Sequence, residues 1–235
     1  MSLSVDSRYC GNVYVVRCSG RIVVGEESTI LENAINRGLR EFVRIVVQLD
    51  EVTRADSTGM GMLVRFLTHT RNRGGDLRLA GVPPFLDQLL QMTRLATIFR
   101  VYPSEEAAIV SFLREPATLN KEEVSSGPKV LFLDQSPDLC AFARGVLRNH
   151  GYEALSTCLV RDARLLLTAG KVDYIVLGPD SSELPSDNVA ASLKPLAANA
   201  RMVVLHSHFK YEDAERATRE LLEKMEQSAG STGAS

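Results

Sequence analysis

The sequence predicts an α/β protein made of two modules of roughly one hundred residues each. Apolar strand-like segments alternate with amphipathic helical segments along the chain, and a polar segment without periodicity divides it. Apolar residues make up 45% of the chain and charged residues 24%, as in proteins that bury a core. Because strands that alternate with helices pair in parallel through right-handed crossovers, we expect a largely parallel sheet in each module.

The dividing segment at 116–128 has proline at both ends, a charged centre and a Ser-Ser-Gly run. The residues before it contain arginine but no lysine, whereas those after it contain both. The final residues are small and polar, which is typical of a disordered tail. The predicted organisation is a first domain at 1–115, a linker at 116–128, a second domain at 129–226 and a tail at 227–235.

Strand and helix signals alternate four times in the first module. β-branched residues predict its first strand, and apolar residues at helical spacing predict the helix that follows. Double glycine ends the second helix, a Pro-Pro pair opens the third, and Ser-Glu-Glu opens the fourth. The predicted strands lie at 13–18, 44–49, 77–80 and 98–102, and the helices at 27–38, 57–72, 83–90 and 104–112.

The second module opens with an apolar strand that ends in an acidic residue, and a glycine follows its first helix. Its functional crevice should lie at the carboxyl ends of the strands, as in other parallel α/β sheets. The predicted strands lie at 129–134, 153–158, 174–177 and 201–206, and the helices at 137–149, 161–169, 187–198 and 212–226.

Composition argues against several function classes. The net charge of −2 and the absence of tryptophan do not favour nucleic-acid binding. No apolar run approaches the roughly 20 residues that span a bilayer, and the first residues do not resemble a secretory signal. We therefore expect a cytoplasmic protein without direct membrane insertion. The cysteines are widely spaced, which favours buried thiols over metal ligands; they are Cys10, Cys18, Cys140 and Cys158.

The most informative local feature is Asp-Ser-Thr-Gly-Met-Gly at 56–61, where a loop enters a helix. Asp56 and Ser57 both suit the N-terminal cap. Glycines in the first helical turn cost about 1 kcal/mol each relative to alanine. Their presence at 59 and 61 therefore suggests close approach of the chain's own sheet or of a partner.

The same helix carries apolar residues on more than one face. Met60 and Leu63 belong to a face about 100° wide that suits a core. Met62 and Phe66 fall almost opposite to it, and a second apolar patch on a surface helix often marks a partner contact. The alternative is that a neighbouring loop covers this patch.

A hydroxyl at this position could act as a switch. Phosphorylation of Ser57 would add roughly −1.5 to −2 charges, which a helix N-terminus tolerates. A partner pressed against the helix would face desolvated negative charge beside Asp56, so binding should fail.

Residues 9–113 resemble a STAS domain, the fold of the anti-sigma-factor antagonists. Six segments carry the resemblance in order: Gly-Arg-Ile at 20–22, Val-Val-Gln-Leu-Asp at 46–50, Asp-Ser-Thr-Gly-Met-Gly at 56–61, Leu-Ala-Gly-Val-Pro at 79–83, Met-Thr-Arg-Leu-Ala at 92–96 and Ile-Phe-Arg-Val-Tyr-Pro-Ser-Glu-Glu-Ala at 98–107.

The resemblance implies that an anti-sigma factor serine kinase phosphorylates Ser57, with Thr58 as the alternative acceptor. The unphosphorylated form would bind that kinase and so release a sigma factor. The expected partner-binding residues are Asp56, Ser57, Thr58, Gly59, Met60, Met62 and Phe66. The chain departs from the family at Arg54 and Ala55, and at Arg94, where the family often has glycine.

Residues 128–226 resemble a response-regulator receiver, a flavodoxin-like fold. A working receiver needs an acidic pair after its first strand to hold Mg²⁺ and an aspartate after its third strand to accept phosphate. Here the pair is Asp134 and Gln135, and the acceptor position is Gly178. The Ser/Thr position falls on His206 or Ser207. We therefore predict a degenerate receiver that serves in protein interaction or dimerisation, with Asp180 a weak substitute acceptor.

The chain shows no phosphate-binding GxxxxGK loop, no nucleophilic triad and no metal-ligand spacing. We expect neither an enzyme nor a cofactor or metal site. The leading hypothesis is an anti-sigma factor antagonist with a serine phospho-switch. The alternative is a constitutive scaffold, in a signalling complex or a membrane transport complex, in which Ser57 only caps a helix.

Overall fold

The computed structural model of the chain describes residues 2–115, 127–180, 186–197, 199–205, 209 and 213–230. The chain divides into two compact units, Met1–Asn120 and Lys121–Ser235. Most of the predicted linker and the end of the predicted tail lie outside the described residues.

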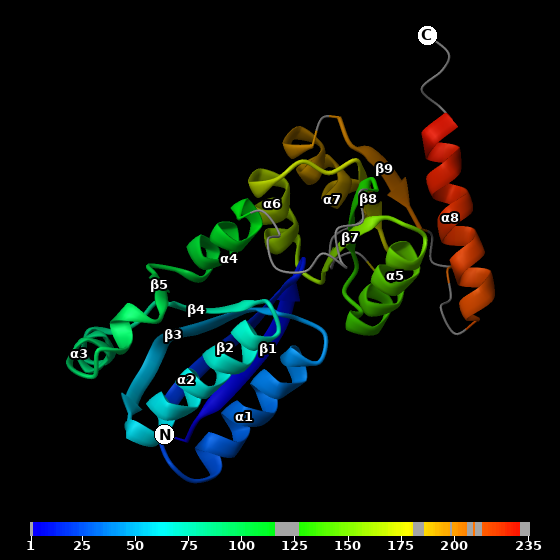
Figure 1. The fold of residues 1–235 in the computed structure, drawn as a ribbon. Coiled ribbons are helices and arrows are strands. Elements are labelled where there is room, and N and C mark those ends of the chain that lie inside the picture. Colours follow the sequence, from blue (N-terminus) through cyan, green and yellow to red (C-terminus); the bar gives the residue numbers. More distant parts are fainter. Residues whose placement is uncertain are drawn as a thin grey trace. The chain divides into compact units, whose positions relative to one another are not determined.

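The first unit contains a mixed five-stranded sheet in the order β5-β4-β3-β2-β1 (Figure 1). The strands β2 to β5 run parallel to their neighbours, whereas β1 is antiparallel to β2. The strands are β1 (Ser4–Cys10), β2 (Val13–Ile22), β3 (Arg44–Ala55), β4 (Asp76–Ala80) and β5 (Arg100–Tyr102). The helices are α1 (Glu26–Leu39), α2 (Ser57–Asn72), α3 (Pro84–Met92), the short 3₁₀ helix η1 (Leu95–Thr97) and α4 (Glu105–Arg114).

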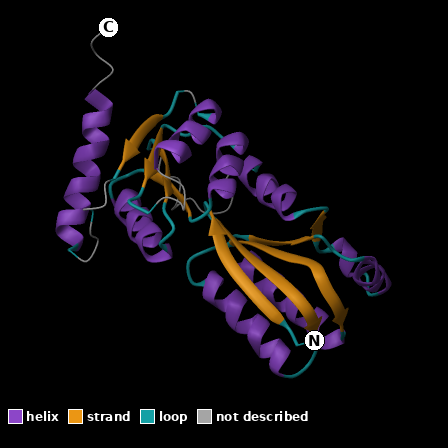
Figure 2. Ribbon diagram, turned by 180° about the vertical axis from the view of Figure 1, so that it is seen from behind, coloured by secondary structure: helices purple, strands orange, loops and turns teal. Residues whose placement is uncertain are grey.

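Helices cover both faces of this sheet. Side chains alternate between the faces of a strand, so Ile45 and Val47 share one face of β3. They join the core formed with α1 and α2, and Figure 2 shows these two helices behind the strands. Arg78 points from β4 to the opposite face, where its guanidinium lies 3.6 Å from the ring centroid of Phe112 on α4. The first unit is therefore a three-layer arrangement of helices, sheet and helix.

The structure adds one strand that the sequence did not predict, β1. Most of its side chains are half-buried or exposed, so its apolar pattern is weak. Gly11 and Asn12 make the two-residue turn that pairs Cys10 with Val13. Glu105, buried at the start of α4, forms ion pairs with Arg8 on β1 and with Arg17 on β2, which fastens this hairpin to α4.

The second unit contains four parallel strands in the order β7-β6-β8-β9. They are β6 (Lys129–Leu133), β7 (Glu153–Thr157), β8 (Tyr174–Leu177) and β9 (Arg201–Val204). The helices are α5 (Pro137–Asn149), α6 (Val160–Ala169), α7 (Ser186–Leu193), the 3₁₀ helix η2 (Lys194–Leu196) and α8 (Ala214–Gly230). The helix α8 continues into the predicted tail, because the segment 227–230 extends its last turn.

Candidate functional site

The turn between β3 and α2 is held by the side chain of Asp56. One of its carboxylate oxygens accepts a hydrogen bond from the backbone N–H of Gly59 at 2.9 Å, which caps α2. The other accepts from the backbone N–H of Val24 at 3.0 Å. The backbone N–H of Asp56 itself donates to the carbonyl of Ile22 at 3.2 Å. The start of α2 is thereby tied to the end of β2 and to the loop that follows it.

These hydrogen bonds also fix the charge of the turn. The backbone N–H groups of Gly59 and Val24 stabilise the carboxylate form, so they lower the pKa of Asp56 below its ordinary value. Asp56 is therefore a carboxylate at neutral pH. A negative charge stands directly before the N-terminus of α2, where the helix dipole favours it.

The two glycines of the first turn have different roles. A Cβ atom on Gly59 would lie 2.4 Å from the carbonyl oxygen of Ile22, so only glycine fits there. A Cβ atom on Gly61 would meet nothing within 4 Å. The expectation of close approach is thus correct for Gly59, where the neighbour is the chain's own strand β2. At Gly61 no part of this chain makes such an approach, and the residue lies on the exposed side of α2.

Ser57 and Thr58 are both exposed at the first two positions of α2. With 100° per residue, Gly61 and Val64 lie within about 40° of Ser57 on the same side of the helix. Val24, which donates to Asp56, has 66% of its surface exposed. We call Val24, Ser57, Thr58, Gly61 and Val64 the Ser57 surface. The contribution of Val24 was missed, because the sequence gives no signal that this valine points away from the core.

The structure corrects the predicted second apolar patch. Met62 and Phe66 are 7% and 3% exposed and belong to the core of the first unit, as does Met60. Because α2 packs against β3 and β4 on one side and α1 on the other, its buried face is wider than one row of side chains. Gly59 is buried as well. Met60, Met62, Phe66 and Gly59 therefore support the turn from inside the fold and do not present side chains to a partner.

The predicted crevice of the second unit is filled by Asp134. Its side chain is fully buried at the end of β6 and accepts hydrogen bonds from the backbone N–H groups of Ser136 at 2.8 Å and Asp180 at 2.9 Å. A Cβ atom on Gly178 would lie 2.2 Å from a carboxylate oxygen of Asp134. The carboxyl group therefore occupies the space where a side chain at position 178 would stand. Burial raises the pKa of Asp134 above its ordinary value.

Two further residues of the predicted crevice, Gln135 and Asp180, lie beside Asp134. Gln135 and Asp180 are exposed, and they meet through a backbone hydrogen bond of 2.8 Å from Gln135 to the carbonyl of Asp180. His206 and Ser207 lie outside the described residues. Across the part of the chain that the structure describes, no three His, Cys, Asp or Glu side chains gather as metal ligands.

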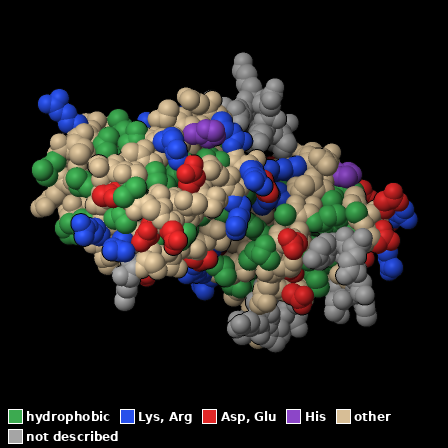
Figure 3. All heavy atoms as spheres, turned by 90° about the horizontal axis from the view of Figure 1, so that it is seen from below, with side chains coloured by type: hydrophobic (Ala, Val, Ile, Leu, Met, Phe, Trp, Pro, Cys, Tyr) green, Lys and Arg blue, Asp and Glu red, His purple; other side chains and the backbone are tan. Residues whose placement is uncertain are grey.

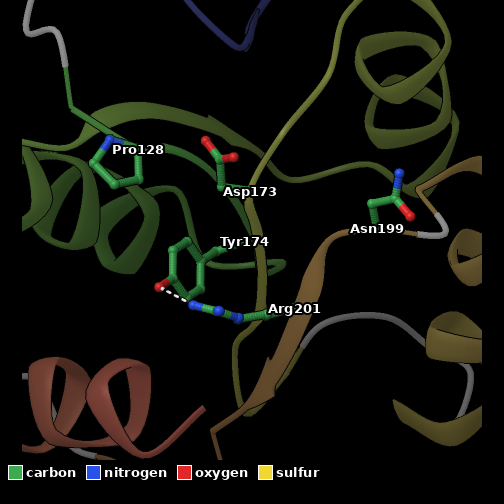
Figure 4. Close-up of a pocket in the computed structure, with 5 residues that line it drawn as sticks. All are labelled: Pro128, Asp173, Tyr174, Asn199 and Arg201. Carbon is green, nitrogen blue, oxygen red and sulfur yellow. Dashed lines mark hydrogen bonds between the residues drawn. The ribbon is translucent and has the colours of Figure 1, made fainter. Parts of the chain in front are cut away.

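A shallow pocket of about 260 Å³ lies at the other end of this sheet, where β8 and β9 begin (Figure 4). Its polar groups bind one another: Arg201 donates to the hydroxyl of Tyr174 at 2.9 Å, and Asp173 accepts from the backbone N–H of Lys129 at 2.7 Å. Ligands of parallel α/β sheets bind at the carboxyl ends of the strands, whereas this pocket lies at their amino ends.

The surface shown in Figure 3 carries acidic and basic side chains interspersed among neutral and apolar groups. None of the helices in the described ranges is both long and apolar enough to cross a membrane.

Comparison with known proteins assigns a family to the first unit. Residues 5–108 match the STAS domain model. The anti-sigma F factor antagonist of Paenibacillus polymyxa is 27% identical over 112 residues, which cover 46% of this chain and 94% of that protein.

Two solved structures match a similar share of the chain. A candidate anti-sigma factor antagonist from Thermotoga maritima is 18% identical with a TM-score of 0.44, over 47% of this chain and 95% of that one. An anti-sigma factor antagonist from Mycobacterium paratuberculosis is 23% identical with a TM-score of 0.40, over 47% and 93%. Residues 5–108 of this chain thus match the STAS domain family, and the curated relative from Paenibacillus polymyxa is an anti-sigma factor antagonist.

Proposed function

We propose that this protein is an anti-sigma factor antagonist that is switched by phosphorylation of Ser57. The observation that carries the proposal is the exposed hydroxyl of Ser57 at the first position of α2, in a turn that Asp56 and Gly59 hold in place. The relative from Paenibacillus polymyxa, an antagonist matched over almost its full length, supports the same role.

The geometry supports a switch that leaves the fold intact. A phosphate on Ser57 would stand in solvent at a helix N-terminus, where the helix dipole and the N–H groups of the first turn favour negative charge. The cap formed by Asp56 uses the N–H of Gly59 and would remain in place. We therefore expect the phosphorylated protein to unfold at nearly the same temperature as the unmodified one.

The same phosphate would block a partner. The residues of the Ser57 surface carry no charged side chain, and the charge of Arg54 acts on the neighbouring Asp56. A partner that covers this surface must also cover the carboxylate of Asp56. Adding a phosphate there would bury two neighbouring negative charges that the single positive charge of Arg54 offsets only in part, which costs several kcal/mol.

The experiment is phosphorylation by candidate anti-sigma serine kinases in Mg-ATP. Trypsin releases the peptide 55–65, which contains Ser57 and Thr58, and fragmentation separates the two hydroxyls. We expect one phosphate on Ser57, none in Ser57→Ala, and unchanged uptake in Thr58→Ala. A kinase that binds the chain but leaves Ser57 unmodified would support the scaffold, in which Ser57 is an ordinary residue of the first turn of α2.

We further propose that the second unit, with limits near 129–226, is a receiver-like domain that does not accept phosphate. Its strand order corresponds to the first four strands of the flavodoxin-like order 2-1-3-4-5. The carboxylate of Asp134 fills the space beside Gly178, so position 178 offers no acceptor side chain, and Gln135 stands where a second acidic ligand is expected. Incubation with acetyl phosphate and Mg²⁺ should leave the mass unchanged. Acyl phosphate on Asp180 would contradict this proposal.

A further inference from the structure

Two cysteines of the second unit lie side by side, although they are far apart in the sequence. The Sγ atoms of Cys140 and Cys158 are 4.0 Å apart, and both residues are reduced thiols. We propose that Cys140 and Cys158 are a redox modification site, at which a hydroperoxide converts the two thiols into a reversible intramolecular disulfide.

The fold itself brings the two thiols together. Cys140 lies in the first helical turn after β6, and Cys158 directly follows β7. The strands β6 and β7 are parallel neighbours, so their carboxyl ends meet at one edge of the sheet. The thiol of Cys140 donates to the carbonyl of Asp134 at 3.3 Å and to that of Thr157 at 3.5 Å. These contacts hold its sulfur between the two strand ends and in reach of Cys158.

The two sulfurs differ in access. Cys158 is half-buried, whereas Cys140 has no exposed surface. Cys158 also precedes the N-terminus of α6, whose capping residue Leu159 makes no side-chain cap. A helix N-terminus stabilises a thiolate, which is the reactive form. Cys158 is therefore the thiol that meets the oxidant first, and Cys140 is the resolving thiol.

The chemistry proceeds in two balanced steps. The sulfur of Cys158 attacks one oxygen of hydrogen peroxide, the O–O bond breaks, and the departing hydroxide takes the thiol proton to form water. The resulting sulfenic acid is attacked by Cys140, the S–S bond forms, and the S–O bond breaks. The second hydroxide leaves as water with the proton of Cys140. Two thiols are oxidised and one peroxide is reduced to two waters.

Closing this bond changes the end of the sheet. The sulfurs must approach from 4.0 Å to about 2.05 Å. Cys140 then loses the proton that it donates to the carbonyl of Asp134. The bond cross-links α5 to the loop that leads into α6. Oxidation of the two thiols therefore changes the hydrogen bonding of the backbone of Asp134, the residue that fills the crevice.

Peptide mapping of the full chain tests this inference. Reduced protein is treated with hydrogen peroxide, remaining thiols are alkylated, and trypsin is added without reductant. Trypsin places Cys140 in the peptide 130–144 and Cys158 in the peptide 149–161. We expect these two peptides to appear linked, and to separate after treatment with a dithiol. Because the bond closes a loop of roughly 20 residues, the second unit should melt roughly 10 °C higher when oxidised.

Matched variants separate the pair from the other thiols. Cys158→Ser should abolish the linked peptide, whereas the double variant Cys10→Ser, Cys18→Ser should keep it. Burial raises the pKa of the Cys18 thiol to about 12, so that thiol stays protonated and should be alkylated only after unfolding. Overoxidation of Cys158 without linkage would overturn the inference, as would a disulfide between two chains. The peptide map of the wild-type protein alone shows whether the two cysteines become linked. The inference therefore stays testable even if a variant does not fold.

Discussion

The two glycines in the first turn of α2 give opposite predictions for the same substitution. In Gly59→Ala, the new methyl group would lie 2.4 Å from the carbonyl oxygen and 2.7 Å from the Cγ2 atom of Ile22. In Gly61→Ala it would meet nothing within 4 Å. The two positions share the helix, the turn and the chemical change, so the difference between them isolates the contact with β2.

The magnitude follows from that geometry. To restore ordinary contact at position 59, α2 must retreat from β2 by about 1 Å, and overpacking of this kind costs about 1–3 kcal/mol. The retreat also weakens the cap between Asp56 and the N–H of residue 59, worth about 1 kcal/mol. The higher helix propensity of alanine offsets about 1 kcal/mol of this loss in the free energy of unfolding. Gly59→Ala should therefore lower the free energy of unfolding by about 2 kcal/mol, and Gly61→Ala should raise it by up to about 1 kcal/mol.

Urea unfolding of the full chain, followed by circular dichroism, measures the free energy of unfolding for both variants. Native-state hydrogen exchange of peptides from 57–72 assigns the change to α2 rather than to the second unit. Two results would refute the reasoning: a Gly59→Ala variant as stable as the wild type, or equal shifts in the same direction for both variants.

Three further predictions rest on single contacts. Asp56→Ala should lower the free energy of unfolding by about 1 kcal/mol, since the cap is lost. The pKa of Asp56 is lowered by folding, so this difference is complete at neutral pH and disappears as the pH falls through the folded-state pKa, below about pH 4; urea titrations at several pH values check it. Arg94 has a left-handed backbone with φ of 59°, so Arg94→Gly should raise the melting temperature, with a stabilisation of about 1 kcal/mol measured by calorimetry. Gly178→Ala should destabilise the wild type more than it destabilises Asp134→Gly, and a double-mutant cycle should give a coupling of at least about 1 kcal/mol.

Local signals in the sequence were sufficient for most elements of both sheets. The buried strands at 44–49 and 129–134 and the helices from 57 and 137 appear where apolar periodicity and caps place them. The strand β1 was not predicted because most of its side chains are exposed or half-buried, so its composition resembles that of a loop.

The site was predictable only in part. The capping residues and the glycine at 56–59 identify the turn from the sequence alone. The exposed face of α2 depends on where α1 packs against it, and this packing of one helix on another is set by the tertiary structure. The sequence therefore predicts a surface patch at Met62 and Phe66, although both residues belong to the core. The pairing of Cys140 with Cys158 depends in the same way on the adjacency of β6 and β7.

The central claim is that a phosphate on Ser57 separates the protein from its kinase. Isothermal titration calorimetry of the kinase, held in ADP, against the Thr58→Ala variant before and after phosphorylation measures this directly. Burying an uncompensated charge costs about 3–5 kcal/mol, so the phosphorylated form should bind at least about 100-fold more weakly. Equal affinity of the two forms would contradict the account and would leave Ser57 as an ordinary residue of the first turn of α2.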